Sequence, residues 1–441
     1  MSTIAAIATA HGRGAIGVVR ISGPKAKHIA REILGRELSP RQATFLPFLD
    51  AEGLAIDEGL VLWFPAPHSY TGEDTLELQG HGGNVVLDQV LARVLSLGAR
   101  LAKPGEFTER AFLQGKLDLA RAEAVADLID AASTQAARAA VRSLQGVFSK
   151  QIKEIVSALT HLRMHVEATL DFPDEELDSP NNTNIQKQLF WIQKKLVEIL
   201  ASAQEGVVLR EGMTVVIAGQ PNVGKSSLLN CLAKREVAIV SPFPGTTRDV
   251  LRESILLDGM PLNILDTAGL RITQDFVEQE GVRRAYAEIE RADQILLVVE
   301  DKTGVGSVEK TILERLSGKL SVTVVRNKAD LTNSTLGLSE GLLGPEVTLS
   351  ATTGAGISEL VQHLKRVVGH SANTGTFSAR RRHLTALKQA QNHVDAAEKS
   401  FRFELLAEEL RLAQDCLGEI TGAVTSDDLL GKIFKNFCIG K

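Results

Sequence analysis

The stretch Gly219-Gln-Pro-Asn-Val-Gly-Lys-Ser-Ser227 decides the fold class of the middle of this chain. It fits the pattern G-x-x-x-x-G-K-[ST] and follows an apolar run that ends at Ala218, which predicts a strand leading into the loop. In such a loop backbone N–H groups surround phosphates, Lys225 reaches the β- and γ-phosphate oxygens, and the Ser226 hydroxyl can ligate Mg²⁺. A glycine-rich turn formed by chance is the alternative, which the helix-forming residues 228–233 disfavour. The sequence therefore predicts a nucleotide-phosphate site.

Three short motifs follow this loop in the order that a GTP-binding domain requires. Asp266-Thr-Ala-Gly269 ends a predicted strand, where a carboxylate can hold the Mg²⁺ shell and the Gly269 N–H can contact a γ-phosphate. Asn327-Lys-Ala-Asp330 ends another, and a carboxylate there can accept both N1–H and N2–H of guanine, a pair that adenine does not offer. Ser350-Ala-Thr352 can supply a backbone contact to the guanine O6. The ordered set predicts GTP as the ligand.

A candidate switch segment, Gly245-Thr-Thr-Arg-Asp249, lies between the phosphate loop and Asp266. We expect Thr247 to close on Mg²⁺ and the γ-phosphate and to relax after hydrolysis. A polar β-turn is the alternative, and the surrounding motifs disfavour it.

The residue after Gly269 bears on how hydrolysis is catalysed. Common small GTPases place a water-orienting Gln at this position, whereas this chain has Leu270, which cannot hydrogen-bond a water. Another side chain must position the water, and the nearest downstream carboxylates are Asp275, Glu278 and Glu280. Each can instead be a solvated carboxylate at the start of a helix predicted over 281–290. That alternative is favoured for Asp275 and Glu280.

The first half of the chain predicts two structural classes in succession. Residues 1–117 mix short β-like runs at 17–21, 60–64 and 75–78 with Gly/Pro turns and a helical stretch at 85–97, which predicts an α+β domain. Beyond Leu117 the pattern becomes helical, and a second helix is predicted over 185–203. Apolar residues at steps of three and four predict one stripe on a single long helix, formed by Val141, Leu144, Phe148, Ile152, Ile155, Leu159, Leu162 and Val166.

Strand–loop–helix alternation from Met213 to about Val368 predicts a parallel sheet with crossover helices. The strand candidates are Thr214–Ala218, Asn263–Leu265, Gln294–Val299, Val322–Arg326 and Glu346–Leu349. Helical periodicity resumes from Arg380. The simplest architecture is therefore a helical domain of residues 118–211 and 372–441, with an α/β domain of residues 212–371 inserted in it.

The composition is that of an ordinary globular protein with several domains. The 441 residues are 44% hydrophobic and 23% charged, which excludes general disorder. A net charge of −5 argues against binding nucleic acid through bulk charge, so any RNA contact must be local or shared with a partner. Three cysteines (Cys231, Cys416 and Cys438) cannot build a disulfide framework and match no zinc spacing. The few cysteines lead us to expect a cytoplasmic, reduced protein. No apolar run approaches the roughly 20 residues of a membrane helix.

Several stretches across the chain form one recognisable set. In the central domain these are Asn222, the run Val240-Ser-Pro-Phe-Pro-Gly-Thr-Thr-Arg-Asp249 and Leu270, and the chain ends in Cys438-Ile-Gly-Lys441. The N-terminal part adds Gly12-Arg-Gly14, Val19-Arg-Ile-Ser-Gly23, Ser69-Tyr-Thr-Gly-Glu-Asp74, Leu76-Glu-Leu-Gln-Gly-His-Gly-Gly83, Pro104-Gly-Glu-Phe-Thr-Glu-Arg110 and Lys116-Leu-Asp-Leu119. Together these stretches resemble the MnmE (TrmE) family of tRNA-modification GTPases, the N-terminal ones matching that family's N-terminal domain.

The resemblance implies a multidomain fold with three parts. The N-terminal α+β domain (1–117) would bind a tetrahydrofolate derivative, 5-formyl- or methylene-tetrahydrofolate, and form a homodimer. A discontinuous helical domain would be interrupted by a Ras-like P-loop G domain. By the family pattern, the folate contacts would be Arg20, Glu77, Lys116 and Lys441.

The resemblance also implies a potassium-dependent, Mg²⁺-dependent GTPase whose G domains pair across the dimer. Asn222, Ser241, Phe243 (through its carbonyl) and Thr246 would hold K⁺, Ser226 and Thr247 would hold Mg²⁺, and Glu278 would orient the attacking water. The full set of expected GTP contacts is Asn222, Val223, Gly224, Lys225, Ser226, Ser227, Ser241, Pro242, Phe243, Pro244, Gly245, Thr246, Thr247, Asp266, Thr267, Ala268, Gly269, Asn327, Lys328, Ala329, Asp330, Ser350, Ala351 and Thr352.

The function implied is GTP hydrolysis coupled to modification of certain tRNAs. With a partner that resembles the FAD- and NADH-binding MnmG, in a heterotetramer or larger complex, the chain would add a (carboxymethyl)aminomethyl group at C5 of the wobble uridine. A ribosome-assembly GTPase acting as a switch module is one alternative, and a folate-dependent methyltransferase with a regulatory G domain is another. The first is disfavoured because no basic RNA-binding domain is visible.

Several residues keep ordinary structural alternatives. Arg20 can form an ion pair at a strand edge, Lys116 can cap a helix, and packing is favoured for Cys438. Thr352 stands where Lys or Arg is more usual, which affects only packing over the base. We expect the C-terminal tail to dock through its apolar residues Ile433, Phe434, Phe437 and Ile439.

Overall fold

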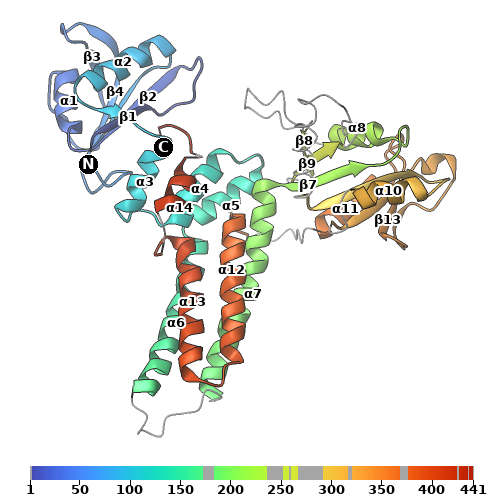
Figure 1. Cartoon of the computed structure of the whole chain (residues 1–441). Helices are drawn as coiled ribbons and strands as arrows, with labels where there is room; N and C mark the ends of the chain where they lie inside the picture. Colours follow the sequence, from blue (N-terminus) through green and yellow to red (C-terminus); the bar gives the residue numbers. More distant parts are fainter. Residues whose placement is uncertain are drawn as a thin grey trace. The chain divides into compact units, whose positions relative to one another are not determined.

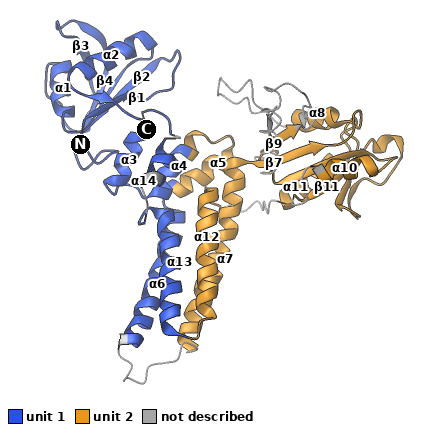
Figure 2. Ribbon diagram, viewed as in Figure 1, with its two compact units in different colours: residues 1–126, 144–177, 402–441 blue, residues 127–143, 178–401 orange. Residues whose placement is uncertain are grey.

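The computed structural model forms two compact units, each described by itself. Unit 1 comprises residues 1–126, 144–177 and 402–441, and unit 2 comprises residues 127–143 and 178–401 (Figure 2). The residues that the structure describes are 2–171, 183–235, 252–257, 260–266, 292–315, 320–367, 376–424, 427–435 and 437–440.

A six-stranded sheet in the order β3-β4-β5-β2-β1-β6 organises the start of unit 1 (Figure 1). All its pairings are antiparallel except that of β1 with β6. The helices α1 (Ala26–Leu34) and α2 (Asn84–Ser96) pack on one face, over alternate residues of the central strands. The strands are β1 (Ile4–Ile7), β2 (Ile16–Ser22), β3 (Thr44–Leu49), β4 (Ala55–Phe64), β5 (Thr75–His81) and β6 (Arg100–Leu101). The predicted α+β domain is confirmed.

Side-chain alternation places a polar pair on the other face of this sheet. Val19 and Ile21 of β2 lie in the core beneath the helices, so Arg20 between them points the opposite way. Glu77 of β5 lies between two core residues in the same manner and is the register partner of Arg20. The face opposite α1 and α2 therefore carries both residues.

Helices complete unit 1. The long helices α6 (Val147–Asp171) and α13 (Phe403–Thr421) pack against each other, and the predicted stripe from Phe148 to Val166 is buried. The single helix predicted to begin at Val141 is wrong: α5 (Thr134–Leu144) ends first, and Gly146 turns the chain with a φ of +88°. Val141 is accordingly exposed. The shorter helices are α3 (Glu106–Leu113), α4 (Leu119–Ile129) and α14 (Asp427–Phe434).

Unit 2 is built on a seven-stranded sheet in the order β12-β13-β11-β10-β7-β9-β8. The five central strands are parallel, as predicted, but the edge strands β8 and β12 run antiparallel to their neighbours. The strands are β7 (Met213–Ala218), β8 (Arg252–Leu257), β9 (Met260–Asp266), β10 (Gln294–Glu300), β11 (Val322–Asn327), β12 (Gly337–Gly341) and β13 (Gly344–Thr348). An apolar core lies on each face of the sheet.

The carboxyl ends of parallel strands meet at one edge of a sheet, which is where such folds bind ligands. At that edge lie the phosphate loop after β7, the end of β9 at Asp266, and the loops after β10, β11 and β13. The helices of unit 2 are α5, α7 (Thr183–Glu211), α8 (Lys225–Arg235), α10 (Ser307–Arg315), α11 (Ile357–Val367), α12 (Arg381–Glu398) and the 3₁₀ turn η2 (Ala329–Leu331). Within the described residues, none of the helices combines the length and the hydropathy needed to cross a membrane.

Candidate functional site

The phosphate loop joins β7 to α8 in a conformation that its sequence dictates. Gly219 has a φ of +146° and Gly224 a φ of +97°, both outside the range that other residues readily adopt. A Cβ on Gly219 would lie 2.2 Å from the carbonyl oxygen of Val298, and one on Gly224 would lie 2.2 Å from Nδ2 of Asn327. The two glycines therefore let the loop pack directly against the ends of β10 and β11.

Lys225 is held over the loop that precedes it. Its Nζ donates hydrogen bonds to the carbonyl oxygens of Gly219 at 2.9 Å and Gln220 at 2.8 Å. An ammonium has three donors, so one N–H remains for a phosphate oxygen. Ser226, next in the chain at the start of α8, is exposed and free to meet a metal ion at the same place.

Asn327 connects the phosphate loop to the loop predicted to contact the base. Its Nδ2 donates to the carbonyl of Val223 at 2.9 Å, and its Oδ1 accepts from the backbone N–H of Ala351 at 2.9 Å. The side chain is buried, so both hydrogen bonds form away from water. Three predicted GTP-contacting segments are thereby fixed to one another through a single amide.

Asp330, the residue predicted to recognise the base, lies in the 3₁₀ turn η2. It is exposed, and its Oδ1 accepts a hydrogen bond of 2.6 Å from the Ser350 hydroxyl. Because a carboxylate has about four acceptor positions, capacity remains for two N–H groups of guanine. Lys328 pairs with Glu300, and Thr352 is exposed beside the turn.

Glu309, which the sequence patterns did not single out, supports the phosphate loop from α10. Its Oε1 accepts from Nε2 of Gln220 at 2.7 Å, and its Oε2 accepts from the Gly306 N–H at 2.9 Å. Burial raises the pKa of Glu309, but these hydrogen bonds outweigh it and lower the pKa below its ordinary value. The ionised carboxylate thus fixes the second residue of the loop. A Glu in the first turn of a helix is too common a pattern to have revealed this role.

Several predicted site residues lie outside the described part of the chain. These are Ser241, Pro242, Phe243, Pro244, Gly245, Thr246, Thr247, Thr267, Ala268, Gly269, Asp275, Glu278, Glu280 and Lys441. For Asp266 the described backbone ends β9 at the same sheet edge as the phosphate loop.

A second candidate site surrounds Arg20 and Glu77 in unit 1. Nε of Arg20 donates to Oε1 of Glu77 at 2.9 Å, and Nη1 of Arg20 donates to the carbonyl of Gly440 at 3.3 Å. The guanidinium also lies 5.7 Å from the Tyr70 ring centroid and 5.9 Å from that of Phe107. The structure therefore brings together two predicted folate-binding residues and the residue before Lys441. Tyr70 is partly exposed beside the ion pair, whereas Phe107 is buried in the core beneath it.

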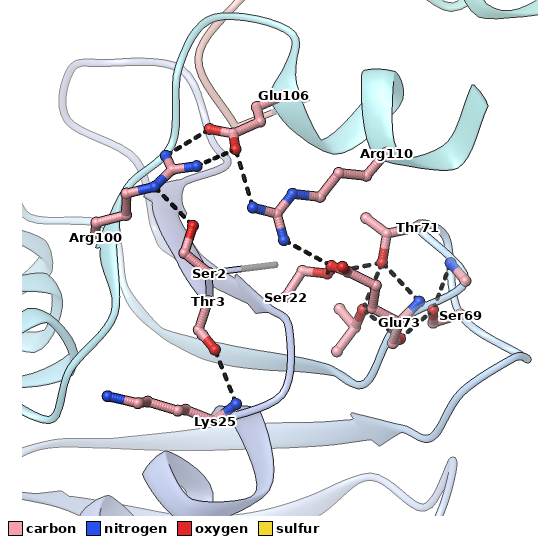
Figure 3. A network of polar contacts seen from close by, with 12 residues as sticks. Ser2, Thr3, Ser22, Lys25, Ser69, Thr71, Glu73, Arg100, Glu106 and Arg110 are labelled. Carbon is pink, nitrogen blue, oxygen red and sulfur yellow. Dashed lines mark hydrogen bonds and ion pairs between the residues drawn. The ribbon is translucent and has the colours of Figure 1, made fainter. Parts of the chain in front are cut away.

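A largely buried ionic network joins the 69–74 loop to α3 (Figure 3). Arg110 of α3 reaches Glu73 at 2.8 Å and Glu106 at 3.0 Å, and Glu106 also accepts from Arg100 at 2.8 Å. Burial raises the pKa of Glu106, but the hydrogen bonds from Arg100, the Lys103 N–H and Arg110 outweigh it and lower the pKa to about 2. The network links the 69–74 loop, which carries Tyr70, to α3, which carries Phe107.

Lys116 is placed differently from the other predicted folate contacts. Its Nζ donates to the carbonyl of Pro67 at 3.0 Å, and its side chain is exposed. Among the contacts of the described residues, none joins Lys116 to Arg20 or Glu77. It lies at the loop that carries Tyr70 rather than at the ion pair.

The C-terminal tail docks on unit 1 mainly as expected. Ile433, Phe434 and Phe437 are buried, and the backbone N–H of Gly105 donates to the carbonyl of Cys438 at 3.3 Å. The expectation that Ile439 takes part is wrong, because this side chain is 57% exposed. The backbone on either side of it makes the contacts instead. The thiol of Cys438 is exposed.

Comparison with known proteins gives matches to two family profiles. The profile of the MnmE helical domain matches residues 119–438, and that of the GTP-binding protein TrmE N-terminus matches residues 3–116.

Solved structures give weaker matches. An Era variant of Aquifex aeolicus bound to GDP and AlF₄⁻ is 25% identical, with 41% of this chain and 66% of that chain covered and a TM-score of 0.28. The G domain of the T. maritima FeoB iron transporter is 23% identical, with 35% of this chain and 98% of that chain covered and a TM-score of 0.26.

Proposed function

The chain belongs to the MnmE/TrmE family of GTPases, and from that membership we propose that it hydrolyses GTP within a system that modifies tRNA. One observation carries the proposal: the two family profiles together span residues 3–116 and 119–438, on both sides of and across the phosphate loop. The geometry of that loop and of Asp330 supports GTP as the nucleotide.

The modification is the addition of a (carboxymethyl)aminomethyl group at C5 of the wobble uridine of certain tRNAs. A flavin- and NADH-binding partner resembling MnmG supplies the redox chemistry and most of the tRNA-binding surface. The net charge of −5 supports this division, because a chain without excess positive charge gains little from phosphate contacts of its own.

In the G domain, the residues of this chain bind and orient the nucleotide. Lys225 uses its remaining donor on a phosphate oxygen, Asp330 accepts the guanine N–H groups, and Glu278 orients the attacking water. Ser226 and Thr247 would hold Mg²⁺, and Asn222, Ser241, Phe243 and Thr246 would hold K⁺. Both ions would supply positive charge to the phosphate oxygens. Ser226 and Asn222 are both exposed at the loop, which suits a metal ligand.

In the N-terminal domain, the site around Arg20 binds a tetrahydrofolate derivative that carries the one-carbon unit. Glu77 accepts N–H groups of the pterin, while Lys441 and Lys116 attract the carboxylates of the glutamate tail. Tyr70, which is partly exposed, offers a flat surface for the rings. The homodimer is formed by this domain.

Nucleoside analysis of tRNA tests the proposal. Cells lacking this chain should lose the modified wobble uridine, and the wild-type gene but not a Lys225→Ala variant should restore it. Unchanged tRNA together with defective ribosomal subunits would instead support the ribosome-assembly alternative. Modification by the purified chain without any partner would favour the methyltransferase alternative.

A further inference from the structure

Asp301, the first residue after β10, has a buried carboxylate that no sequence motif explains. Only 3% of its side chain is exposed. It accepts a hydrogen bond of 2.8 Å from Nε of Arg326 and further hydrogen bonds from the hydroxyls of Thr332 and Ser334. Three donors thus converge on one carboxylate from the segment that surrounds η2.

The backbone of Asp301 engages the same segment. Its N–H donates to the carbonyl of Asn327 at 2.8 Å, and its carbonyl accepts from Nη2 of Arg326 at 2.9 Å. Asp301 therefore contacts the chain before η2 through Arg326 and Asn327, and after η2 through Thr332 and Ser334. The turn that carries Asp330 is held at both ends by this one residue.

The backbone conformation on either side of the turn explains why stabilising contacts are needed there. Lys328 has a φ of +67° and Asn333 a φ of +52°, so a left-handed residue other than glycine lies on each side of Asp330. Such conformations cost of order 1 kcal/mol or more each and persist only where surrounding contacts impose them. The hydrogen bonds to Asp301 supply contacts of that kind.

We propose that Asp301 is a positioning residue for guanine recognition: it fixes η2 so that the Asp330 carboxylate faces the N1–H and N2–H groups of the base. The inference rests on the proposed binding of GTP. Asp301 itself touches no base and acts only through Asp330.

The protonation state of Asp301 agrees with this role. Burial raises the pKa of Asp301, but the hydrogen bonds from Ser334, Thr332 and Arg326 outweigh it and hold the pKa below its ordinary value. The carboxylate is therefore ionised at neutral pH and accepts from all three donors at once. Among the described residues, Arg326 also lies 3.4 Å from the carboxylate of Glu346.

The test compares the affinities of GDP and inosine diphosphate, whose base lacks the 2-amino group and so gives Asp330 only one N–H. Asp301→Ala should weaken GDP binding about tenfold, roughly the loss of one hydrogen bond to a charged group, and weaken inosine diphosphate binding much less. The preference for GDP over inosine diphosphate should therefore shrink. Thr303→Ala is the matched control, because its hydroxyl in the same loop bonds, among the described residues, to the Glu300 carbonyl rather than to the segment around η2.

Ser334→Ala protects the test against a variant that fails to fold, since it removes one donor from a half-buried position. It should reduce the preference for GDP over inosine diphosphate, as Asp301→Ala does, but by a smaller factor. Equal losses of affinity for GDP and inosine diphosphate in either variant would show a general structural role for Asp301. That result would overturn this inference but leave the proposed function standing. A wild-type chain without any preference for GDP would overturn the proposed function as well.

Discussion

The side-chain amide of Asn327 donates a hydrogen bond of 2.9 Å to the carbonyl of Val223, and so ties the end of β11 to the phosphate loop. The same amide accepts from Ala351 in the loop after β13. The loops predicted to bind the base and the phosphates are therefore not independent of each other. A substitution that loosens one of these loops should therefore also alter the position of the other.

Asn327→Ala should weaken GDP binding and destabilise the G domain together. Two buried backbone groups, on Val223 and Ala351, would lose their partner, at a cost of about 1–3 kcal/mol each. Fluorescence titration with a labelled GDP measures the affinity, which should fall at least tenfold. Asn230→Ala, on the exposed face of α8, is the control and should leave the affinity within twofold.

Turnover should depend on K⁺ or on ions of its size. Asn222 stands at the loop with an exposed side chain, so its oxygen is available to a cation. The measurement is kcat in matched KCl and NaCl, with Asn222→Ala expected to remove the difference. Asn222 also has a φ of +66°, so Asn222→Gly separates the two roles of this residue. If the glycine variant keeps the full response to K⁺, the side chain is not a ligand.

Glu278→Ala should lower kcat by a factor of about 10²–10⁴ while leaving GTP affinity nearly intact, as expected for loss of a group that orients the attacking water. The motivation is Leu270, which cannot orient water. Asp275→Ala and Glu280→Ala serve as neighbouring controls and should be mild. Weak nucleotide binding with normal turnover in Glu278→Ala would identify a structural carboxylate instead.

Glu106 should make the N-terminal domain sensitive to acid. Because the pKa of Glu106 is about 2 in the folded state, against 4.5 ordinarily, its stabilisation is complete above about pH 4.5 and is lost as the pH falls toward 2. Glu106→Gln should therefore cost about 1–3 kcal/mol at pH 7, and the difference from wild type should shrink below pH 4.

Tryptophan fluorescence can follow this unfolding. The chain has two tryptophans, so a Trp191→Phe background leaves Trp63 of β4 as the reporter. The control is Glu109→Gln on the same helix, where burial and the neighbouring Glu106 raise the pKa of Glu109. Removing its charge should be neutral or slightly stabilising at pH 7. A Glu106→Gln variant with the same pH profile as wild type contradicts the role of the network.

The sequence predicted best the elements whose side chains are buried in a simple pattern. The strands β7, β10 and β11 are continuous apolar runs because both faces of a parallel sheet are covered, and their predicted bounds agree within about one residue. The break between α5 and α6 was missed because Leu144 and Phe148 keep helical spacing across it. Gly146 was the one local signal there.

The residues of the candidate sites also differ in whether the sequence alone can reveal them. Lys225 and Asp330 belong to contiguous motifs and can be found from the sequence alone. Asp301 and Glu309 act on residues about 20 to 90 positions away, so only the tertiary fold brings them to the loops that they hold. The docking of the tail was predictable from its apolar residues. The sequence could not predict that Gly440, rather than Ile439, makes the close contact, because this depends on the path of the backbone.

The C-terminal tail should be required for folate binding through the backbone at Gly440. This residue has a φ of +97°, and a Cβ added to it would lie 2.7 Å from the carbonyl oxygen of Ile7 and 2.9 Å from Cα of Ala8. Gly440→Ala should therefore displace the tail from Arg20, whose Nη1 now donates to the Gly440 carbonyl. Calorimetry with 5-formyl-tetrahydrofolate should show an affinity about tenfold lower or worse, and tRNA modification should fall with it.

Two comparisons decide whether the tail acts in this way. Gly431→Ala is the matched control, because this glycine of α14 has open space around its Cβ position, so folate affinity should stay at the wild-type value. Deleting Cys438–Lys441 should abolish tRNA modification but spare GTP binding and basal hydrolysis, since the predicted nucleotide contacts all lie between Asn222 and Thr352. A truncated chain that modifies tRNA at the wild-type rate would show that the docked tail has no part in the chemistry. Lost GTP hydrolysis in the truncated chain would instead show that the tail supports the G domain.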